Sequence, residues 1–137
     1  MNPSTADGMR DDHTIRKCVG FAMNAGYGGI QVMNLFALRA TEPTELRKAE
    51  DPVGPRNNEY LAAIPEGVVV AAWGAIPWWG KGKIVERERV VLNMLESRVW
   101  HSFGLTSASW PCHPARVPYS ANLVPWDWRA SLKVRAR

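Results

Sequence analysis

The sequence predicts an α/β fold with a small, mostly parallel sheet and helices on both of its faces. Apolar runs typical of strands alternate with amphipathic stretches typical of helices, which is the order found in α/β proteins. The expected strands are residues 29–36, 68–73 and 98–105, and the clearest helices are residues 11–25 and 82–97. The 137 residues, 46% hydrophobic and 22% charged, suit one ordinary domain with a hydrophobic core.

The expected helices follow from the spacing of their apolar residues. In residues 11–25 that spacing is i, i+3, i+4, i+7, i+8, formed by Ile15, Cys18, Val19, Ala22 and Met23. Asp11 or Asp12 can cap the start of this helix, and Gly26 can end it. The helix at residues 82–97 has an apolar side formed by Ile84, Val91, Leu92 and Leu95. Two shorter helices, each with an early proline, are expected at residues 41–49 and 55–63.

The clearest strand is residues 68–73, which read Val-Val-Val-Ala-Ala-Trp. A continuous apolar run is typical of an interior strand that is covered on both faces. Residues 29–36 are expected to form a mostly buried strand, and residues 98–105 a weaker one. Four prolines between positions 111 and 125 argue against regular structure in that segment.

The sequence also indicates a compartment. Its longest apolar stretch is far too short to cross a bilayer, and its first residues lack the pattern of a secretory signal. Two cysteines, Cys18 and Cys112, cannot make a disulfide framework. We therefore expect a cytoplasmic, monomeric protein with no membrane contact.

Charge divides the chain into unlike halves. Residues 1–68 hold seven Lys/Arg against nine Asp/Glu, a net of −2, and residues 69–137 hold ten against four, a net of +6. All seven tryptophans lie in the second half. Basic side chains beside exposed aromatic rings suit single- or double-stranded DNA, with contacts expected from Arg116, Arg129 and Lys133. The alternative is that the tryptophans are core residues and that residues 129–137, after a domain at 1–128, are a solvated tail.

The first candidate motif is Asn2-Pro3-Ser4-Thr5-Ala6-Asp7. These residue types can simply cap a helix and form turns, but Asn2 lies far before the expected helix. The functional interpretation makes Asn2 an amide that positions water or substrate, held by the rigid Pro3. Ser4 lacks the glycines of a nucleophile elbow. Functional loops of open α/β sheets follow strands, so we expect that a leading strand is missing or that the sheet is small.

The second candidate motif is Trp110-Pro111-Cys112-His113-Pro114. His113, fixed between prolines, could donate a hydrogen bond to a developing anion or act in acid–base chemistry, unless it is an ordinary loop histidine. No Cys-x-x-Cys pair or spaced Cys/His cluster supports a zinc site, so neither a metal nor a cofactor is expected.

A third candidate is Asn34, which is polar within the apolar segment 30–36. A buried amide needs partners, because leaving it unpaired costs about 1–3 kcal/mol. Neighbouring loops could satisfy it, or it could read the hydrogen-bonding edge of a base. Arg39, just beyond, could contact phosphate.

The motifs together resemble a bacterial and phage family that is known as a domain of unknown function. The resemblance rests on Asn2-Pro3-Ser4-Thr5-Ala6-Asp7, Asp11-Asp12-x-Thr14-Ile15-Arg16, Gly26-Tyr27-Gly28-Gly29, the run from Asn34 to Thr41, Asp51-Pro52-Val53-Gly54-Pro55, Trp73-Gly74 and His113-Pro114. Relatives usually carry a strand before the first of these motifs, and a proline is common where this chain has His13.

The order of the motifs is also similar to that of the uracil-DNA glycosylase superfamily. The resemblance implies that Asn2 orients the attacking water, that Asn34 recognises the base, and that His113 begins the late His-Pro motif. Pro3, Ser4 and Arg39 would then contact the substrate. The chain departs from the family after Pro114, where Ala-Arg replaces Ser-Pro and puts the DNA-wedging loop in doubt.

The expected function is therefore a DNA base glycosylase-like hydrolase that cleaves the N-glycosidic bond of a flipped uracil or modified base. Two alternatives stay open, a non-catalytic nucleotide- or nucleic-acid-binding module and a small hydrolase of free nucleosides or nucleotides. The glycosylase interpretation predicts that Asn2, Asn34 and His113 converge on one pocket.

Overall fold

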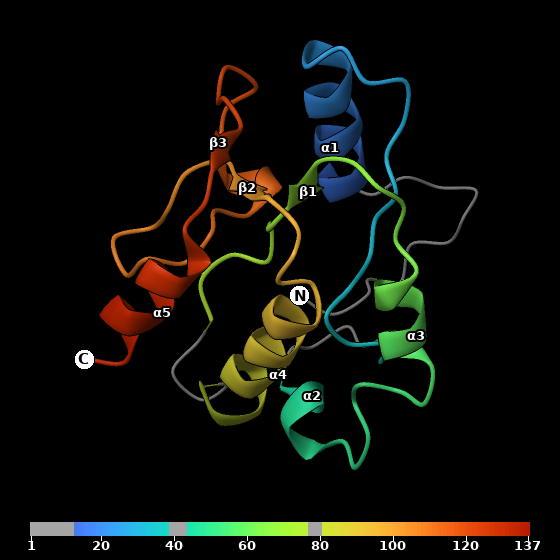
Figure 1. The fold of residues 1–137 in the computed structure, drawn as a ribbon, viewed down its shortest axis with the longest axis vertical. Coiled ribbons are helices and arrows are strands. Elements are labelled where there is room, and N and C mark those ends of the chain that lie inside the picture. Colours follow the sequence, from blue (N-terminus) through green and yellow to red (C-terminus); the bar gives the residue numbers. More distant parts are fainter. Residues whose placement is uncertain (1–12, 39–43, 77–80) are drawn as a thin grey trace. The chain divides into compact units, whose positions relative to one another are not determined.

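The chain is mixed helix and sheet in a computed structural model that describes residues 13–38, 44–76 and 81–137. Along the chain (Figure 1) the elements are α1 His13–Asn24, α2 Glu45–Lys48, α3 Asn57–Ala62, β1 Val69–Val70, α4 Lys81–Met94, β2 Trp100–Ser102, the 3-10 helix η2 Pro114–Arg116, β3 Val124–Pro125 and α5 Trp128–Arg135. None of the helices within these ranges has the length and apolar composition needed to cross a membrane.

The described residues divide into two compact units, which are treated separately. The first unit contains residues 33–69 and 76–99 as far as they are described, and therefore holds α2, α3 and α4. The second contains the described residues of 13–32, 70–75 and 100–137, and holds α1, β2, η2, β3 and α5.

In the first unit, the predicted amphipathic face of α4 is buried as expected. Its apolar residues Ile84, Val91, Leu92 and Leu95 belong to the core, together with Leu35, Phe36, Leu46 and Leu61. The predicted short helices are also confirmed, at α2 and α3, with α2 described from Glu45 onward. The segments that connect these helices are largely irregular, so their backbone carbonyls need hydrogen-bond donors from elsewhere.

The sheet is small, with the strand order β1-β2-β3. Strands β2 and β3 are antiparallel, with His101 opposite Pro125 and Ser102 opposite Val124. The predicted strand at residues 98–105 is thus confirmed as the shorter β2. A mostly parallel sheet with helices on both faces stays a prediction.

Tryptophan rings form much of the core of the second unit. The rings of Trp73, Trp100 and Trp126 meet edge to face, with centroids 5.8–6.4 Å apart. Such arrangements bury large apolar areas and add a favourable contact between the positive edge and the negative face of the rings. In the same unit the predicted helix at residues 11–25 is confirmed as α1.

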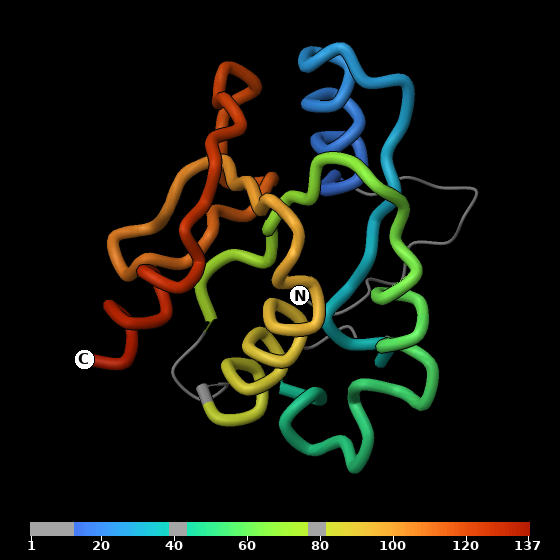
Figure 2. Tube along the Cα trace, viewed as in Figure 1, coloured from blue at the N-terminus to red at the C-terminus, as the bar shows by residue number. Residues whose placement is uncertain are grey.

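The predicted strand at residues 29–36 is wrong. This segment has neither helix nor strand, and the trace in Figure 2 runs through it without coiling. The carbonyls of Asn34 and Leu35 accept hydrogen bonds from the side chain of Asn57, at 3.1 and 3.0 Å, instead of from a neighbouring strand. An apolar run alone cannot specify a strand, because a strand needs a partner elsewhere in the chain.

Two further expectations need correction. Residues 68–73 contribute only the two residues of β1, which lies at the edge of the described sheet and not in its interior. Val68, at its start, is 43% exposed. The proline-rich segment does contain regular structure, because Pro114 begins η2 and Pro125 lies in β3. Both places tolerate proline: a helical first turn and an edge strand.

The last residues form helix α5. The carboxylate of Asp127 caps it by accepting a hydrogen bond from the backbone N–H of Ala130 at 3.0 Å. Trp128 and Ser131 are buried, and the hydroxyl of Ser131 accepts a hydrogen bond from the indole N–H of Trp126 at 2.8 Å. Most of residues 129–137 therefore belongs to a packed helix.

We expect Ser131→Ala to lower the free energy of unfolding by about 1–3 kcal/mol, because it leaves the buried indole N–H of Trp126 without its acceptor. Urea denaturation followed by tryptophan fluorescence measures the change. Ser120→Ala, at an exposed serine of the same unit, is the control and should change stability by less than about 0.5 kcal/mol. Equal effects of the two substitutions would contradict a stabilising role for this bond.

Candidate functional site

His113 lies directly before η2 in the second unit. The imidazole Nδ1 accepts a hydrogen bond from the backbone N–H of Ala115 at 3.2 Å. In the neutral ring, an accepting Nδ1 leaves the proton on Nε2, so Nε2 is the hydrogen-bond donor. The side chain is half-buried, and the prolines on either side of the Cys112-His113 pair are buried. The hydrogen bond from Ala115 therefore favours the neutral tautomer that carries its proton on Nε2.

Gly74 packs against His113 within the second unit. Its φ is +77°, and a Cβ atom built at this position would lie 3.0 Å from the Cβ atom of His113. Both the backbone conformation and the close approach favour glycine here. The Trp73-Gly74 and His113-Pro114 motifs, 39 positions apart by residue number, are therefore neighbours in the structure.

The loop that carries His113 is held on both sides. Before it, the backbone N–H of Cys112 donates to the carbonyl of Gly104 at 3.0 Å. After it, the ammonium group of Lys17 on α1 donates to the carbonyl of Val117 at 2.6 Å. That ammonium group also lies 3.9 Å from the ring centroid of Tyr119, a cation–π contact. These contacts attach the backbone on both sides of His113 to residue 104 and to α1.

Asn34 belongs to a polar cluster in the first unit. Its carbonyl accepts from the side chain of Asn57, and the carbonyl of Leu35 accepts from Nε of Arg87 at 2.6 Å. Nη1 of Arg87 donates to the side-chain oxygen of Asn58. The cluster therefore joins the segment that follows Val32 to α3 and α4 through backbone carbonyls and polar side chains.

Two charged residues, Arg87 and Glu88, are buried on α4. Arg87 is 5% exposed, and Glu88 is fully buried. Burial lowers the pKa of Arg87, because removal from water disfavours the charged form. Buried charges cost free energy and gather at functional sites.

The sequence-based expectations did not include this pair, although the spacing carries a signal for it. Positions 87 and 88 follow Ile84 by three and four residues and precede Val91 by four and three, so they fall within the apolar stripe. A charged residue at a stripe position indicates either a buried charge or an incorrect stripe. In this helix it indicates a buried charge.

The other predicted site residues are placed only in part. Asn2, Pro3, Ser4 and Arg39 lie outside the described residues. Asn34 belongs to the first unit and His113 to the second, so their convergence with Asn2 stays a prediction.

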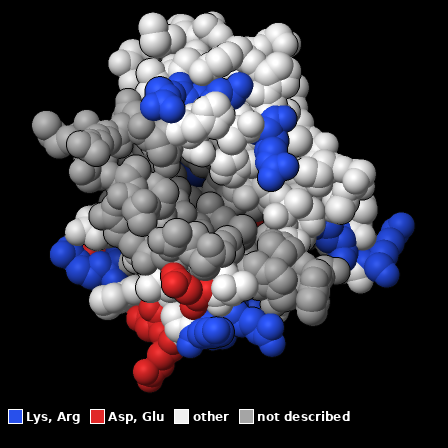
Figure 3. Space-filling model, turned by 180° about the vertical axis from the view of Figure 1, so that it is seen from behind, with Lys and Arg blue, Asp and Glu red and all other residues white. Residues whose placement is uncertain are grey.

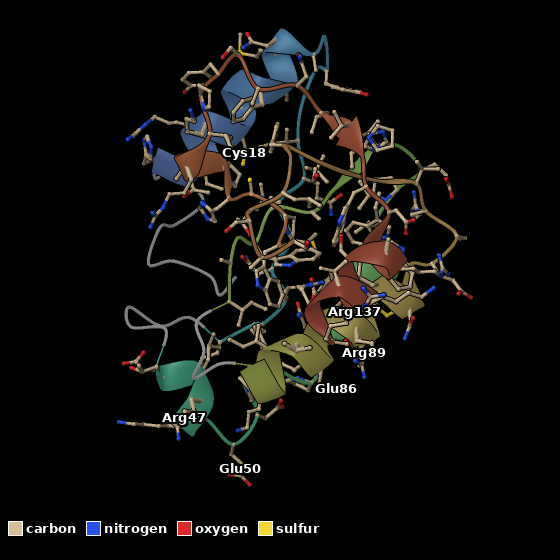
Figure 4. All side chains as sticks on the ribbon, turned by 90° about the vertical axis from the view of Figure 1, so that its left-hand side faces the viewer. Cys18, Arg47, Glu50, Glu86, Arg89 and Arg137 are labelled. Atoms are coloured by element: carbon tan, nitrogen blue, oxygen red, sulfur yellow. The ribbon has the colours of Figure 1, made fainter. Side chains whose placement is uncertain are left out.

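No group of three or more His, Cys, Asp or Glu that could hold a metal ion occurs among residues 13–38, 44–76 and 81–137. Cys18, labelled in Figure 4, and Cys112 are thiols and do not form a disulfide.

The burial of the described tryptophans shows whether they are core residues or exposed aromatic rings. Trp73, Trp100, Trp110, Trp126 and Trp128 are all buried, so these five are core residues. Trp78 and Trp79 lie outside the described part of the chain. The proposed DNA contacts Arg116, Arg129 and Lys133 are exposed, and the guanidinium of Arg129 lies 4.1 Å from the ring centroid of Trp128.

Charge on the surface of the first unit is mixed around α2. Glu45 lies in the first turn of this helix, and Arg47 and Lys48 in its last turn. Figure 3 shows acidic and basic side chains together at the lower edge of the face it displays. A surface of both signs attracts a polyanion less than a uniformly basic one does.

A family model described as "Protein of unknown function (DUF1643)" matches residues 1–115. No significant match was found among curated proteins or among solved structures. The matched range includes Asn34, Arg87 and His113 and ends before β3 and α5.

We expect Gly74→Ala to destabilise the protein by about 1–3 kcal/mol, since it forces a side chain into a positive φ and against His113. Gly82→Ala is the control, because Gly82 lies in α4 with nothing within 4 Å of the added Cβ atom, and it should leave stability unchanged or raise it by up to about 1 kcal/mol. Urea denaturation followed by circular dichroism gives both values. The NMR resonances of the His113 ring should shift in Gly74→Ala, and an unshifted ring in a fully stable variant would remove the role assigned to Gly74.

Proposed function

The chain belongs to the DUF1643 family, and for this member we propose a DNA base glycosylase-like hydrolase with a uracil-DNA glycosylase-like fold. Its substrate is DNA in which a uracil or modified base is flipped out of the helix. The observation that carries the proposal is the packing of Gly74 against His113. This contact joins two motifs whose order along the chain is similar to that of the glycosylase superfamily.

The reaction that we propose breaks the bond between C1′ of the sugar and the ring nitrogen of the base, and forms a bond from C1′ to a water oxygen. Positive charge develops on the sugar, and negative charge develops on the leaving base. The Nε2–H of His113 is suited to donate a hydrogen bond to that anion, since Nδ1 already accepts from Ala115. The base leaves with the electron pair and is protonated, while the water loses its proton to solvent.

The remaining roles belong to the proposal as well. Asn2 would orient the water, with Pro3 and Ser4 beside it against the substrate. Asn34 would read the Watson–Crick edge of the flipped base, and Arg39 would contact a phosphate. An amide can position water without being a strong base, because positioning alone lowers the barrier.

One observation favours a second candidate, a nucleotide- or nucleic-acid-binding module without catalysis. The Arg87 cluster offers a buried cation beside polar side chains, and binding an anion there requires none of the proposed catalytic residues. Release of free base separates the two candidates, since only the hydrolase produces it.

The test is to incubate the protein with a duplex that carries a single uracil or modified base, and separately with the free nucleoside, and to measure the released base. We expect release from the duplex, and we expect His113→Ala to slow it by about 10²–10³-fold, as for loss of one preorganised donor. Asn2→Ala should slow it as well. His13→Ala, at the exposed first residue of α1, is the control and should retain the wild-type rate.

Circular dichroism must show that each variant is folded. Wild-type rates in both His113→Ala and Asn2→Ala would rule out the proposed roles. Release from the nucleoside alone would instead identify a small nucleoside hydrolase.

DNA binding is expected to depend on salt through Arg129 and Lys133, which lie four positions apart on α5 and are exposed. In double-stranded DNA, each phosphate that a cation neutralises adds about 0.9 to the magnitude of the negative slope of log affinity against log salt. Arg129→Gln with Lys133→Gln should therefore reduce the slope by about 1.8 without changing base preference. Point substitutions are preferable to removal of residues 129–137, because that deletion also removes buried Ser131.

A salt titration on single- and double-stranded DNA measures the slope. The matched control is Arg56→Gln with Arg89→Gln, two exposed arginines of the first unit, for which the slope should not change. An unchanged slope in the α5 variant would exclude these two residues as phosphate contacts.

A further inference from the structure

The guanidinium group of Arg87 has hydrogen-bond donors for which the described part of the chain supplies no acceptor. Its Nε donates to the carbonyl of Leu35 at 2.6 Å, and its Nη1 donates to the side-chain oxygen of Asn58. Its Nη2 is buried and has no hydrogen-bond partner. An arginine presents five N–H donors in a fixed plane, and the two on Nη2 have no acceptor among the described residues.

Among the residues that the structure describes, no carboxylate forms an ion pair with Arg87. Both acceptors are neutral oxygens, one from a backbone carbonyl and one from an amide. The ion pairs Arg56–Glu59, Glu86–Arg89 and Glu66–Arg98 do not include Arg87. Burial of a cation among neutral partners is costly, and desolvation accordingly lowers the pKa of this group.

We propose that Nη2 of Arg87 binds an oxyanion of the phosphate class. Arg87 would then be a ligand-binding residue in addition to those of the proposed glycosylase site. An anion is the ligand that fits, because it supplies both the missing acceptor and the missing negative charge. A neutral base would supply only the acceptor. The proposal rests on the proposed function in one respect, namely that the anion is the phosphate of a nucleotide, either free or within DNA.

The position of Arg87 supports a ligand that is recognised together with Asn34. The guanidinium holds the carbonyl of Leu35, the residue next to Asn34, and Asn57 holds the carbonyls of both. A phosphate on Arg87 and a base read by Asn34 would therefore be recognised by groups that share one hydrogen-bonded cluster within the first unit. We expect discrimination between a nucleotide and its nucleoside to depend on Arg87.

The experiment compares the affinities of deoxyuridine 5′-monophosphate, deoxyuridine, inorganic phosphate and a short uracil-containing single strand, measured by calorimetry on the full chain. Wild type should bind the monophosphate at least tenfold more tightly than the nucleoside, as expected for a hydrogen bond to a charged group. Inorganic phosphate should compete with the monophosphate. Tight binding of the single strand with weak binding of the monophosphate would identify DNA as the source of the phosphate.

The test variant is Arg87→Gln, and its matched control is Arg89→Gln. Figure 4 labels Arg89 on α4, two positions away, where it is exposed and lies 3.7 Å from Glu86. Both substitutions remove one positive charge from the same helix. We expect Arg87→Gln to abolish the preference for the monophosphate and Arg89→Gln to leave it unchanged.

Three results would overturn the inference. They are equal affinities of wild type for monophosphate and nucleoside, no competition by inorganic phosphate, and an unchanged preference in a folded Arg87→Gln variant. The first two use only the wild-type protein, so they decide the matter even if the variant does not fold. Phosphate binding without base release would contradict the proposed glycosylase and leave the anion site standing, whereas base release without phosphate discrimination would do the reverse.

Discussion

The backbone carbonyls of the irregular segments must find hydrogen-bond donors, and in this protein long cationic side chains provide many of them. In the first unit, Lys83 donates to carbonyls at the C-terminal end of α2, and Arg98 donates to the carbonyls of residues 64 and 65. Arg87 donates to Leu35, and in the second unit Lys17 donates to residue 117. Strands of two or three residues leave many carbonyls outside any ladder, and an unpaired buried carbonyl is costly. In the irregular parts of both units, side-chain donors therefore form hydrogen bonds that a neighbouring strand would otherwise supply.

These hydrogen bonds reduce the number of basic side chains that are available on the surface. The sequence assigns a net of +6 to residues 69–137, which suggests a surface for a polyanion. Lys83, Arg87 and Arg98 belong to that count but donate to backbone carbonyls of the first unit. The guanidinium of Arg135 lies 3.6 Å from the ring centroid of Trp110, which is also a structural contact. The exposed basic charge is therefore smaller than the total, and it includes Lys133 and Arg129, although the guanidinium of Arg129 also lies over Trp128.

The sequence predicted helices well and strands poorly, for a physical reason. A helix is specified within a few residues by its own period, so α1 and α4 fall where their apolar spacing placed them, and α3 follows the early proline that predicted it. A strand needs a partner from a distant segment, and the apolar run at residues 29–36 finds side-chain donors in its place. The same limit applies to the site. The sequence singled out His113 and Gly74, but their contact depends on folding, and the burial of Arg87 depends on the packing of a whole helix.

Packing alone explains neither Gly74 nor Arg87. An apolar side chain at position 87 would continue the buried stripe of Ile84 and Val91 and avoid the cost of desolvating a charge, and such replacements are often neutral or stabilising. The bonds from Arg87 to Leu35 and Asn58 account for Nε and Nη1 and leave Nη2 unexplained. Gly74 similarly adopts a positive φ that most residues avoid, and what it gains is the close approach of His113. A buried unpaired charge and a positive φ both go against local structural preference, and such departures are expected at functional sites. Both residues lie within the range matched by the family model. What the two features present is a closely packed imidazole in one unit and, in the other, a buried guanidinium whose Nη2 has no acceptor among the described residues.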